Sequence, residues 1–203
     1  MAGSGFGTVF RITTWGESHG KALGVVVDGC PAGIPLSGED IAPYMERRRP
    51  NGGTMSTQRN EEDKIEILSG VFDGKTTGTP ISMLIRNKDE RSRDYGNIAE
   101  SYRPGHADYG FDAKYGFRDY RGGGRSSGRE TAGRVAAGAI AQKLLSMMGI
   151  ECRAVLDRVG NIPASCTEAC EELVRQCREE MDSIGSVVRC TVTGMPAGVG
   201  DPV

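Results

Sequence analysis

Alternating apolar and polar positions predict a series of short strands along the chain. Residues 8–13 and 23–28 fit two strands joined by the polar loop 16–20. Period-two alternation places every second side chain on one buried face, as in a half-buried strand. Further strands are predicted by the same pattern, or by a short apolar run, at residues 64–68, 81–85, 151–159 and 187–193.

Three stretches have the apolar spacing of amphipathic helices. The first begins at Ser37, where Ser-Gly-Glu-Asp fits a capping box, and extends to about residue 48. The second spans residues 129–148 with Gly149 as its expected C-cap, and the third spans residues 167–182 with Thr167 as its expected N-cap. In the second helix, Gly133 and Gly138 are expected to allow close packing, beside an apolar face of Val135, Ala136, Ala139, Ile140, Lys143 and Leu144.

Residues 87–128 show no lasting periodicity and are rich in Gly, Arg, Asp and Tyr. Loops of this length are usually functional or disordered. We therefore expect a single domain over residues 1–203, with 87–128 as a long functional loop region. The order of the predicted elements favours an α/β (α+β) fold class built from βαβ-like pieces.

One segment of the chain is echoed later in the sequence. Residues 26–33 and 191–198 both run from a predicted strand into a Gly-x-Pro-Ala-Gly turn. The sequence leaves two explanations open. One is a common turn that is used twice, and the other is a pseudo-symmetric fold that is cut partway through its second half.

The composition excludes several classes of protein. A net charge of −2 excludes a generally basic nucleic-acid binder. No apolar run approaches the ~18 residues of a membrane span, and residues 1–7 lack the features of a signal peptide. We therefore expect a cytoplasmic protein. The six cysteines form no C-x-x-C pair and lie away from both histidines, so neither disulfides nor a metal site are expected.

Basic residues nevertheless cluster in two places. Between residues 101 and 134 there are seven Arg and Lys against four acidic residues, and Arg47, Arg48 and Arg49 are consecutive. Such clusters in a net-acidic chain indicate a local anion site. For the three consecutive arginines, a solvated helix end that complements the helix dipole is the alternative explanation.

The loop 121–131 is the strongest candidate for that anion site, because it opens the helix at 129–148. Its glycines let a ligand approach the backbone, and a helix N-terminus favours an anion. Further donors come from Arg121, Arg125, Ser126, Ser127 and Arg129. The loop is neither a Walker A loop nor a dinucleotide-binding fingerprint. The alternatives are a flexible loop in which Ser127 only caps the helix, and an RGG-like RNA-binding element, which a single copy disfavours.

The chain has only two histidines, His19 and His106, and both lie in Gly-flanked polar loops. Imidazole titrates near neutrality, so both are candidates for giving or taking a proton in catalysis. Together with the anion-binding features, they predict an enzyme that acts on a phosphorylated, carboxylated metabolite.

Several long motifs, in register, resemble the signatures of the chorismate synthase family. They are GESHG at 16–20, with LG at 23–24 and VDG at 27–29, RRRP at 47–50, TQR at 57–59, RPGHAD at 103–108 and GGGRSSGRET at 122–131. The resemblance covers essentially the whole chain. It implies a layered fold with helices packed between antiparallel sheets, internal pseudo-symmetry and a homotetramer.

The resemblance also implies an activity in the shikimate pathway, which leads to the aromatic amino acids. The family converts 5-enolpyruvylshikimate 3-phosphate to chorismate and phosphate by an anti 1,4-elimination, with reduced FMN as cofactor and a link to NADP. His19 would donate a proton to the substrate phosphate, and His106 would lie by the flavin. The implied substrate-binding residues are Ser18, Arg47, Arg48 and Arg129, and the implied FMN-binding residues are His106, Arg125, Ser126 and Ser127.

The chain departs from the family in two ways. Thr54 stands where some bacterial members have a basic residue. Family members are also typically much longer, so the chain is expected to be an N-terminal portion that is incomplete at its C-terminus. We therefore expect the 203 residues by themselves to lack much of the flavin site and to be inactive.

Overall fold

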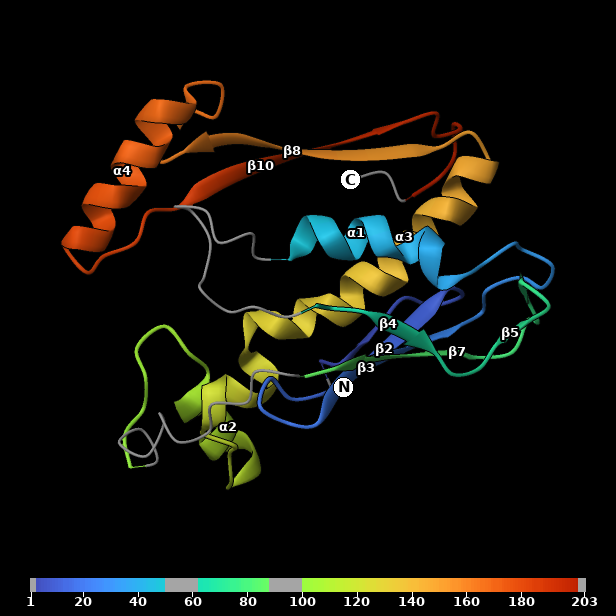
Figure 1. The fold of residues 1–203 in the computed structure, drawn as a ribbon, viewed down its shortest axis with the longest axis horizontal. Coiled ribbons are helices and arrows are strands. Elements are labelled where there is room, and N and C mark those ends of the chain that lie inside the picture. Colours follow the sequence, from blue (N-terminus) through green and yellow to red (C-terminus); the bar gives the residue numbers. More distant parts are fainter. Residues whose placement is uncertain (1–2, 50–61, 88–99, 201–203) are drawn as a thin grey trace. The chain divides into compact units, whose positions relative to one another are not determined.

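The computed structural model describes residues 3–49, 62–87 and 100–200. The chain divides into two compact units, the first formed by residues 1–49 and 60–141 and the second containing residues 142–203 (Figure 1). Each unit is described by itself below. The expectation of a single domain over residues 1–203 stays a prediction.

The first unit is built on a five-stranded antiparallel sheet. Its strand order is β1-β2-β3-β7-β4. The strands are β1 (Gly5–Phe6), β2 (Arg11–Gly16), β3 (Ala22–Asp28), β4 (Ile65–Ile67) and β7 (Ile81–Arg86), and a separate pair is formed by β5 (Val71–Phe72) and β6 (Lys75–Thr76). The strands predicted at 23–28, 64–68 and 81–85 are confirmed. The first predicted strand begins later than expected, because β2 pairs with β3 only from Arg11, opposite Asp28, onward.

The core of this unit lies on one face of the sheet. The central strands place apolar side chains on that face at every second position, and these are Leu23, Val25, Val27, Ile81, Met83 and Ile85. Helix α1 (Gly38–Arg48) adds the buried Ile41 and Met45. Figure 1 shows α1 and the first part of α3 (Thr131–Met147) on the same side of the sheet. The capping box is confirmed, since the Ser37 backbone N–H donates to Asp40 Oδ2 over 2.7 Å.

Helix α3 starts two residues later than its pattern predicts. The 3₁₀ turn Gly128–Glu130 precedes it, and Ser127 caps that turn by accepting a hydrogen bond from the Arg129 backbone N–H. The expected close packing is confirmed at Gly133, where an added Cβ would lie 3.2 Å from the Gly24 carbonyl oxygen. The expectation of close packing is wrong for Gly138, where an added Cβ would have open space around it.

Two glycine substitutions test this packing. At Gly24 an added Cβ would lie 2.2 Å from the Trp15 ring and 2.8 Å from the Met83 carbonyl oxygen. We expect Gly24→Ala to lower the free energy of unfolding by about 1–3 kcal/mol, because the indole and the β7 backbone must move. The matched control, Gly138→Ala, is expected to raise it by about 0.5–1 kcal/mol through helix propensity alone. Urea unfolding measures both, and equal effects of the two changes would contradict the packing.

The segment 100–128 contains a helix that the sequence pattern did not predict. Helix α2 (Asp108–Tyr115) has no continuous apolar stripe, and it ends at Gly116, whose φ of 71° is left-handed. An ion pair between Arg103 and Asp108 fixes its first turn. The helix is therefore set by polar contacts that apolar periodicity does not reveal. Residues 88–99 of the predicted loop region lie outside the described residues.

The second unit pairs a three-stranded antiparallel sheet with one helix. The strand order is β10-β8-β9, and the elements are β8 (Glu151–Val159), β9 (Ile162–Pro163), α4 (Thr167–Glu179) and β10 (Ser186–Thr193). The strands predicted at 151–159 and 187–193 are confirmed. Helix α4 is shorter than predicted, and its N-cap is Cys166 rather than Thr167.

Every strand pair among the described residues is antiparallel. The fold is therefore mixed α+β, and the expected βαβ-like pieces, which need parallel neighbours, are not among the described elements. None of the described helices is long and apolar enough to cross a membrane.

The sequence echo corresponds to two turns of the same geometry. Gly29 and Gly194 have φ values of 78° and 74°, and an added Cβ would lie about 2 Å from the carbonyl oxygens of Val9 and Gly149, at 1.9 and 2.0 Å. The second glycines of the two turns, Gly33 and Gly198, have φ values of 84° and 88°. Both turns also follow a strand that is paired with an antiparallel neighbour. This agreement favours internal pseudo-symmetry over a turn used twice by chance.

Candidate active site

The loop between β2 and β3 carries the first predicted catalytic residue. It is tight, because the Gly20 N–H donates to the Glu17 carbonyl over 3.1 Å. His19 and Ser18 are both buried, with 6% and 1% of their surfaces exposed. Ser18 Oγ lies 3.1 Å from His19 Nδ1, so the hydroxyl holds one side of the imidazole ring. The sequence placed His19 in a polar loop but did not reveal that the loop is folded into the protein.

Asn87, directly after β7, fixes this loop to the start of α3. Its Nδ2 donates to the carbonyl oxygens of Glu17, over 3.0 Å, and Gly20, over 2.7 Å. Its Oδ1 accepts from Arg129 Nε over 2.8 Å. Sequence reasoning missed Asn87, and its only signal is a polar residue directly after an apolar strand.

Two of the predicted substrate-binding arginines meet on one carboxylate. Arg129 Nη1 donates to Asp63 Oδ1 over 2.6 Å, and Arg48 Nη1 donates to Asp63 Oδ2. The Asp63 side chain is fully buried, and its backbone has a φ of 50°. Arg129, which is 6% exposed, is thereby held between Asp63 and Asn87. Asp63 was not among the residues that the sequence singled out.

The remaining residues of the first basic cluster are less involved. Arg47 is exposed on the last turn of α1 and is not part of the Asp63 cluster in the contacts that the structure describes. Arg49 pairs with Glu46 over 2.8 Å on the same turn. Pro50, Thr54 and the TQR motif at 57–59 lie outside the described residues.

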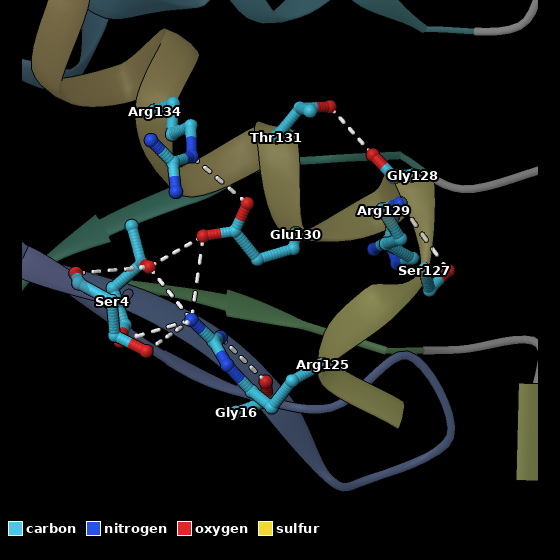
Figure 2. A network of polar contacts seen from close by, with 10 residues as sticks. Ser4, Gly16, Arg125, Ser127, Gly128, Arg129, Glu130, Thr131 and Arg134 are labelled. Atoms are coloured by element: carbon cyan, nitrogen blue, oxygen red, sulfur yellow. Dashed lines mark hydrogen bonds and ion pairs between the residues drawn. The ribbon is translucent and has the colours of Figure 1, made fainter. Parts of the chain in front are cut away.

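Arg125 connects the glycine-rich turn Arg121–Ser126 to strand β2 (Figure 2). Its Nη1 donates to the Gly16 carbonyl over 2.9 Å, and its Nη2 donates to Thr14 Oγ1 over 2.7 Å. Glu130 completes the network, because Oε1 pairs with Arg125 over 3.3 Å and Oε2 with Arg134 over 3.0 Å. The guanidinium of Arg125 is thus held by protein atoms, and its predicted contact with FMN stays a prediction.

The charge on Glu130 is maintained by its partners. Burial alone would raise the pKa of Glu130, but the hydrogen bonds from Arg134 and Thr14 and the charges of Arg134 and Arg125 outweigh it. The pKa therefore lies below its ordinary value. Glu130 remains an acceptor for Arg125 at neutral pH, which keeps the turn Arg121–Ser126 beside β2.

The second predicted histidine lies at the other side of the same glycine-rich turn. His106 is exposed, and its Nδ1 lies 3.3 Å from the Pro104 carbonyl oxygen. At Gly123, whose φ is 86°, an added Cβ would lie 3.4 Å from both His106 Cδ2 and Ser126 Oγ and 3.2 Å from Arg103 Nη2. These three polar side chains therefore converge on a spot that only glycine leaves open. Ser127, next in the chain, uses its Oγ to cap the turn before α3.

The segment that carries His106 is braced by an ionic cluster. Arg103 donates through Nε and Nη2 to Asp108, over 3.1 and 3.2 Å, and Arg118 pairs with Asp112 over 3.0 Å. The Arg118 guanidinium also lies over the Tyr102 ring, 5.2 Å from its centroid. The hydrogen bond from Arg103 is the main reason that the pKa of Asp108 lies below its ordinary value.

This shift predicts how the His106 segment responds to acid. A carboxylate whose pKa is lowered by folding stabilises the folded protein while it is ionised. This contribution is complete above the unfolded-state pKa, which is near 3.8 for Asp, and it is lost as the pH falls through the lower folded-state pKa. We expect Asp108→Asn to destabilise the protein by about 1–3 kcal/mol at pH 7 and to have a progressively smaller effect as the pH falls below 3.8. Unfolding free energies of both proteins across this range measure the difference, and a difference that does not change with pH would contradict it.

Asp119 brings a further carboxylate near His19. It accepts hydrogen bonds from Arg121 Nε and Nη2, each over 2.8 Å. Arg121 is the main cause of the lowered pKa of Asp119, and the charge of His19 acts in the same direction. The turn Arg121–Ser126 itself lies beside the His19 loop, because an added Cβ at Gly124 would be 4.0 Å from Glu17 Cγ.

The arrangement groups the predicted residues into two sets. The first set lies around the His19 loop and contains His19, Ser18, Arg48 and Arg129, which are connected through Asp63 and Asn87. The second set lies around Gly123 and contains His106 and Ser126. Within the described residues, no group of three or more His, Cys, Asp or Glu side chains is placed to hold a metal ion. Two guanidiniums that share a carboxylate, one of them linked through Asn87 to the loop of a buried imidazole, are groups that can bind a dianion and supply a proton to it.

Comparison with known proteins gives a consistent assignment. A family model described as chorismate synthase matches residues 10–203. The chorismate synthase of Lachnoclostridium phytofermentans is 53% identical over 223 aligned positions, which cover 100% of this chain and 61% of the relative. That of Syntrophobacter fumaroxidans is 54% identical and covered to 63%, and that of Methanocella arvoryzae is 51% identical and covered to 60%.

A solved structure agrees with these sequence relatives. A crystal structure of a chorismate synthase matches with a TM-score of 0.72 and 30% identity, over 93% of this chain and 59% of the solved chain. The chain thus spans about three fifths of the length of the relatives it matches. Given the family model over residues 10–203, the relatives and this shared fold, the chain belongs to the chorismate synthase family.

Proposed function

We propose that this chain forms the phosphate-binding side of a chorismate synthase active site, in which 5-enolpyruvylshikimate 3-phosphate is converted to chorismate and phosphate. The observation that carries the proposal is the joining of Arg48 and Arg129 by Asp63 beside the His19 loop. Membership of the family supports the choice of substrate.

In this proposal the arginines and His19 act on the departing phosphate. The C–O bond to the phosphate breaks with its electron pair leaving on oxygen, and the guanidiniums of Arg48 and Arg129 stabilise the growing negative charge. His19 acts as general acid on that phosphate. Because Ser18 Oγ engages Nδ1, we assign the transferred proton to Nε2. Arg47, exposed on α1, and Ser18 complete the proposed substrate-binding set.

The flavin side of the site is proposed around Gly123. The side chains of His106, Arg103 and Ser126 lie close around the Gly123 backbone, which supports binding of a group that accepts hydrogen bonds and comes close to the main chain. His106, Ser126, Ser127 and Arg125 would hold reduced FMN, and the His106 imidazole would hold or give a proton toward the flavin. When bound, reduced FMN would supply transient electron density and accept a proton from the substrate. Reduction linked to NADP, a homotetramer and a cytoplasmic location belong to the same proposal.

The test is phosphate release from 5-enolpyruvylshikimate 3-phosphate under anaerobic conditions with chemically reduced FMN. The complete product of the gene is expected to release phosphate, and omission of reduced FMN is expected to stop it. Calorimetry with the same substrate measures binding separately, and the mass in solution tests the tetramer. A folded, complete product that neither binds the substrate nor releases phosphate would refute the proposal.

The 203-residue chain by itself is expected to bind the substrate weakly and to release no phosphate, because the flavin site is expected to be incomplete. Titration with FMN, followed by the change in flavin absorbance, measures this directly. Tight FMN binding by the 203 residues would show that the expectation of an incomplete flavin site is wrong.

A further inference from the structure

Asn87 is the residue through which the His19 loop and Arg129 are linked. Besides its three side-chain hydrogen bonds, its backbone N–H donates to the Lys21 carbonyl over 3.2 Å. The loop that carries His19 is therefore held at Glu17, Gly20 and Lys21 by one residue at the end of β7. That residue follows Arg86, which is paired with Ala22 across the sheet.

Only a side-chain amide suits this position. The Nδ2 group has two N–H donors, and here they meet two carbonyl oxygens, while Oδ1 accepts from the Arg129 guanidinium. A carboxylate at this position would still accept a hydrogen bond from Arg129, but it would place an oxygen acceptor against the carbonyl oxygens of Glu17 and Gly20. A hydrocarbon side chain would make neither the hydrogen bond to Arg129 nor those to the two carbonyls. The amide thus joins a backbone that needs donors to a cation that needs an acceptor.

The link matters because its two ends have different tasks in the proposed function. Arg129 is proposed to bind the phosphate and His19 to protonate it, and a proton transfer requires heavy atoms within ~2.6–3.2 Å of each other. A small displacement of the proton-donating side chain lowers the rate of the chemical step more than the affinity for the substrate, because it changes the geometry at the reacting atoms.

We propose that Asn87 is a positioning residue that sets the place of His19 relative to Arg129 without touching the substrate. This inference rests on the proposed function for its kinetic consequences. Its structural content, that Asn87 determines the setting of the His19 ring, stands by itself.

Three variants separate the two ends of the link. In the complete gene product, Asn87→Asp keeps the acceptor for Arg129 and loses both donors to the His19 loop, so we expect kcat to fall by about 10–100-fold, as for residues that orient a catalytic group. Its KM is expected to change by less than about threefold, since Arg129 stays held. Asn87→Ala loses both ends and is expected to lower kcat and raise KM. Asn87→Gln keeps the amide and is expected to recover part of kcat. The matched control is Asn161→Asp, at an exposed turn of the second unit.

A measurement on the imidazole itself makes the test independent of turnover. The chain has only two histidines, so its proton NMR spectrum contains two histidine Cε1–H signals, which a His106→Gln variant assigns. We expect Asn87→Asp and Asn87→Ala to shift the His19 signal and its pH titration and to leave the His106 signal unchanged. Asn161→Asp is expected to move neither.

The outcomes distinguish this inference from the proposed function. An unchanged His19 signal in both Asn87 variants, or a kcat equal to that of the control, would overturn the positioning role. If the unaltered complete gene product neither binds the substrate nor releases phosphate, the proposed function fails, and the NMR comparison on the 203-residue chain still decides whether Asn87 positions His19.

Discussion

Replacing Asp63 with Asn is expected to lower the free energy of unfolding by about 3–5 kcal/mol, because it leaves two arginines without the charge that joins them. The Asp63 side chain is fully buried, and Arg129 and Arg48 are 5% and 16% exposed at their side chains. An amide has one acceptor oxygen, so it can receive one guanidinium and must present N–H groups to the other. Urea unfolding of the variant and of the unaltered protein measures the loss.

The matched control for Asp63 is an exposed ion pair of the same chemical type. Asp28 pairs with Arg11 over 2.9 Å, with both side chains about half exposed. We expect Asp28→Asn to change the free energy of unfolding by only about 0–1 kcal/mol, since water and salt screen such pairs. A similar loss for the two variants would contradict the role of Asp63 as a buried bridge. In the complete gene product, Asp63→Asn is also expected to raise KM, because Arg48 and Arg129 would no longer be held together.

The second large effect is expected at His19. In the complete gene product, His19→Ala is expected to slow phosphate release by about 10²–10⁴-fold, the range for loss of a general acid. Substrate binding is expected to persist, because Arg48 and Arg129 are held by Asp63 and not by the imidazole. Single-turnover phosphate release and substrate calorimetry measure the two effects separately.

His106→Ala provides the comparison for this prediction. His106 is exposed beside Gly123 rather than buried beside Ser18, so its loss is expected to affect the flavin-dependent part of the reaction and FMN affinity. A His19→Ala protein that releases phosphate within tenfold of the normal rate, with its fold intact, would exclude His19 as the proton donor.

Two central strands were predictable because their buried positions give them a local apolar pattern. The strands at 23–28 and 81–85 and the cap at Ser37 follow from such patterns. The strands at 151–159 and 187–193 were also predicted from their sequence patterns, although most of their side chains are exposed. Helix α2 was missed because its start depends on the Arg103–Asp108 pair rather than on an apolar stripe. Gly138 was misjudged because periodicity does not say which glycine of a helix faces a neighbour.

By itself, the sequence determined the family, the two histidines and the anion-binding loop, since these depend on residue type and short spacing. Only the tertiary structure revealed Asp63 and Asn87, and only it turned Arg125 into a link between the glycine-rich turn and β2. Asp63 is 66 positions from Arg129 along the chain, and Arg125 is 109 positions from Gly16. Such contacts depend on the sheet register and the helix packing of the folded protein. Local spacing does not encode a hydrogen bond between residues that folding brings together from distant parts of the chain.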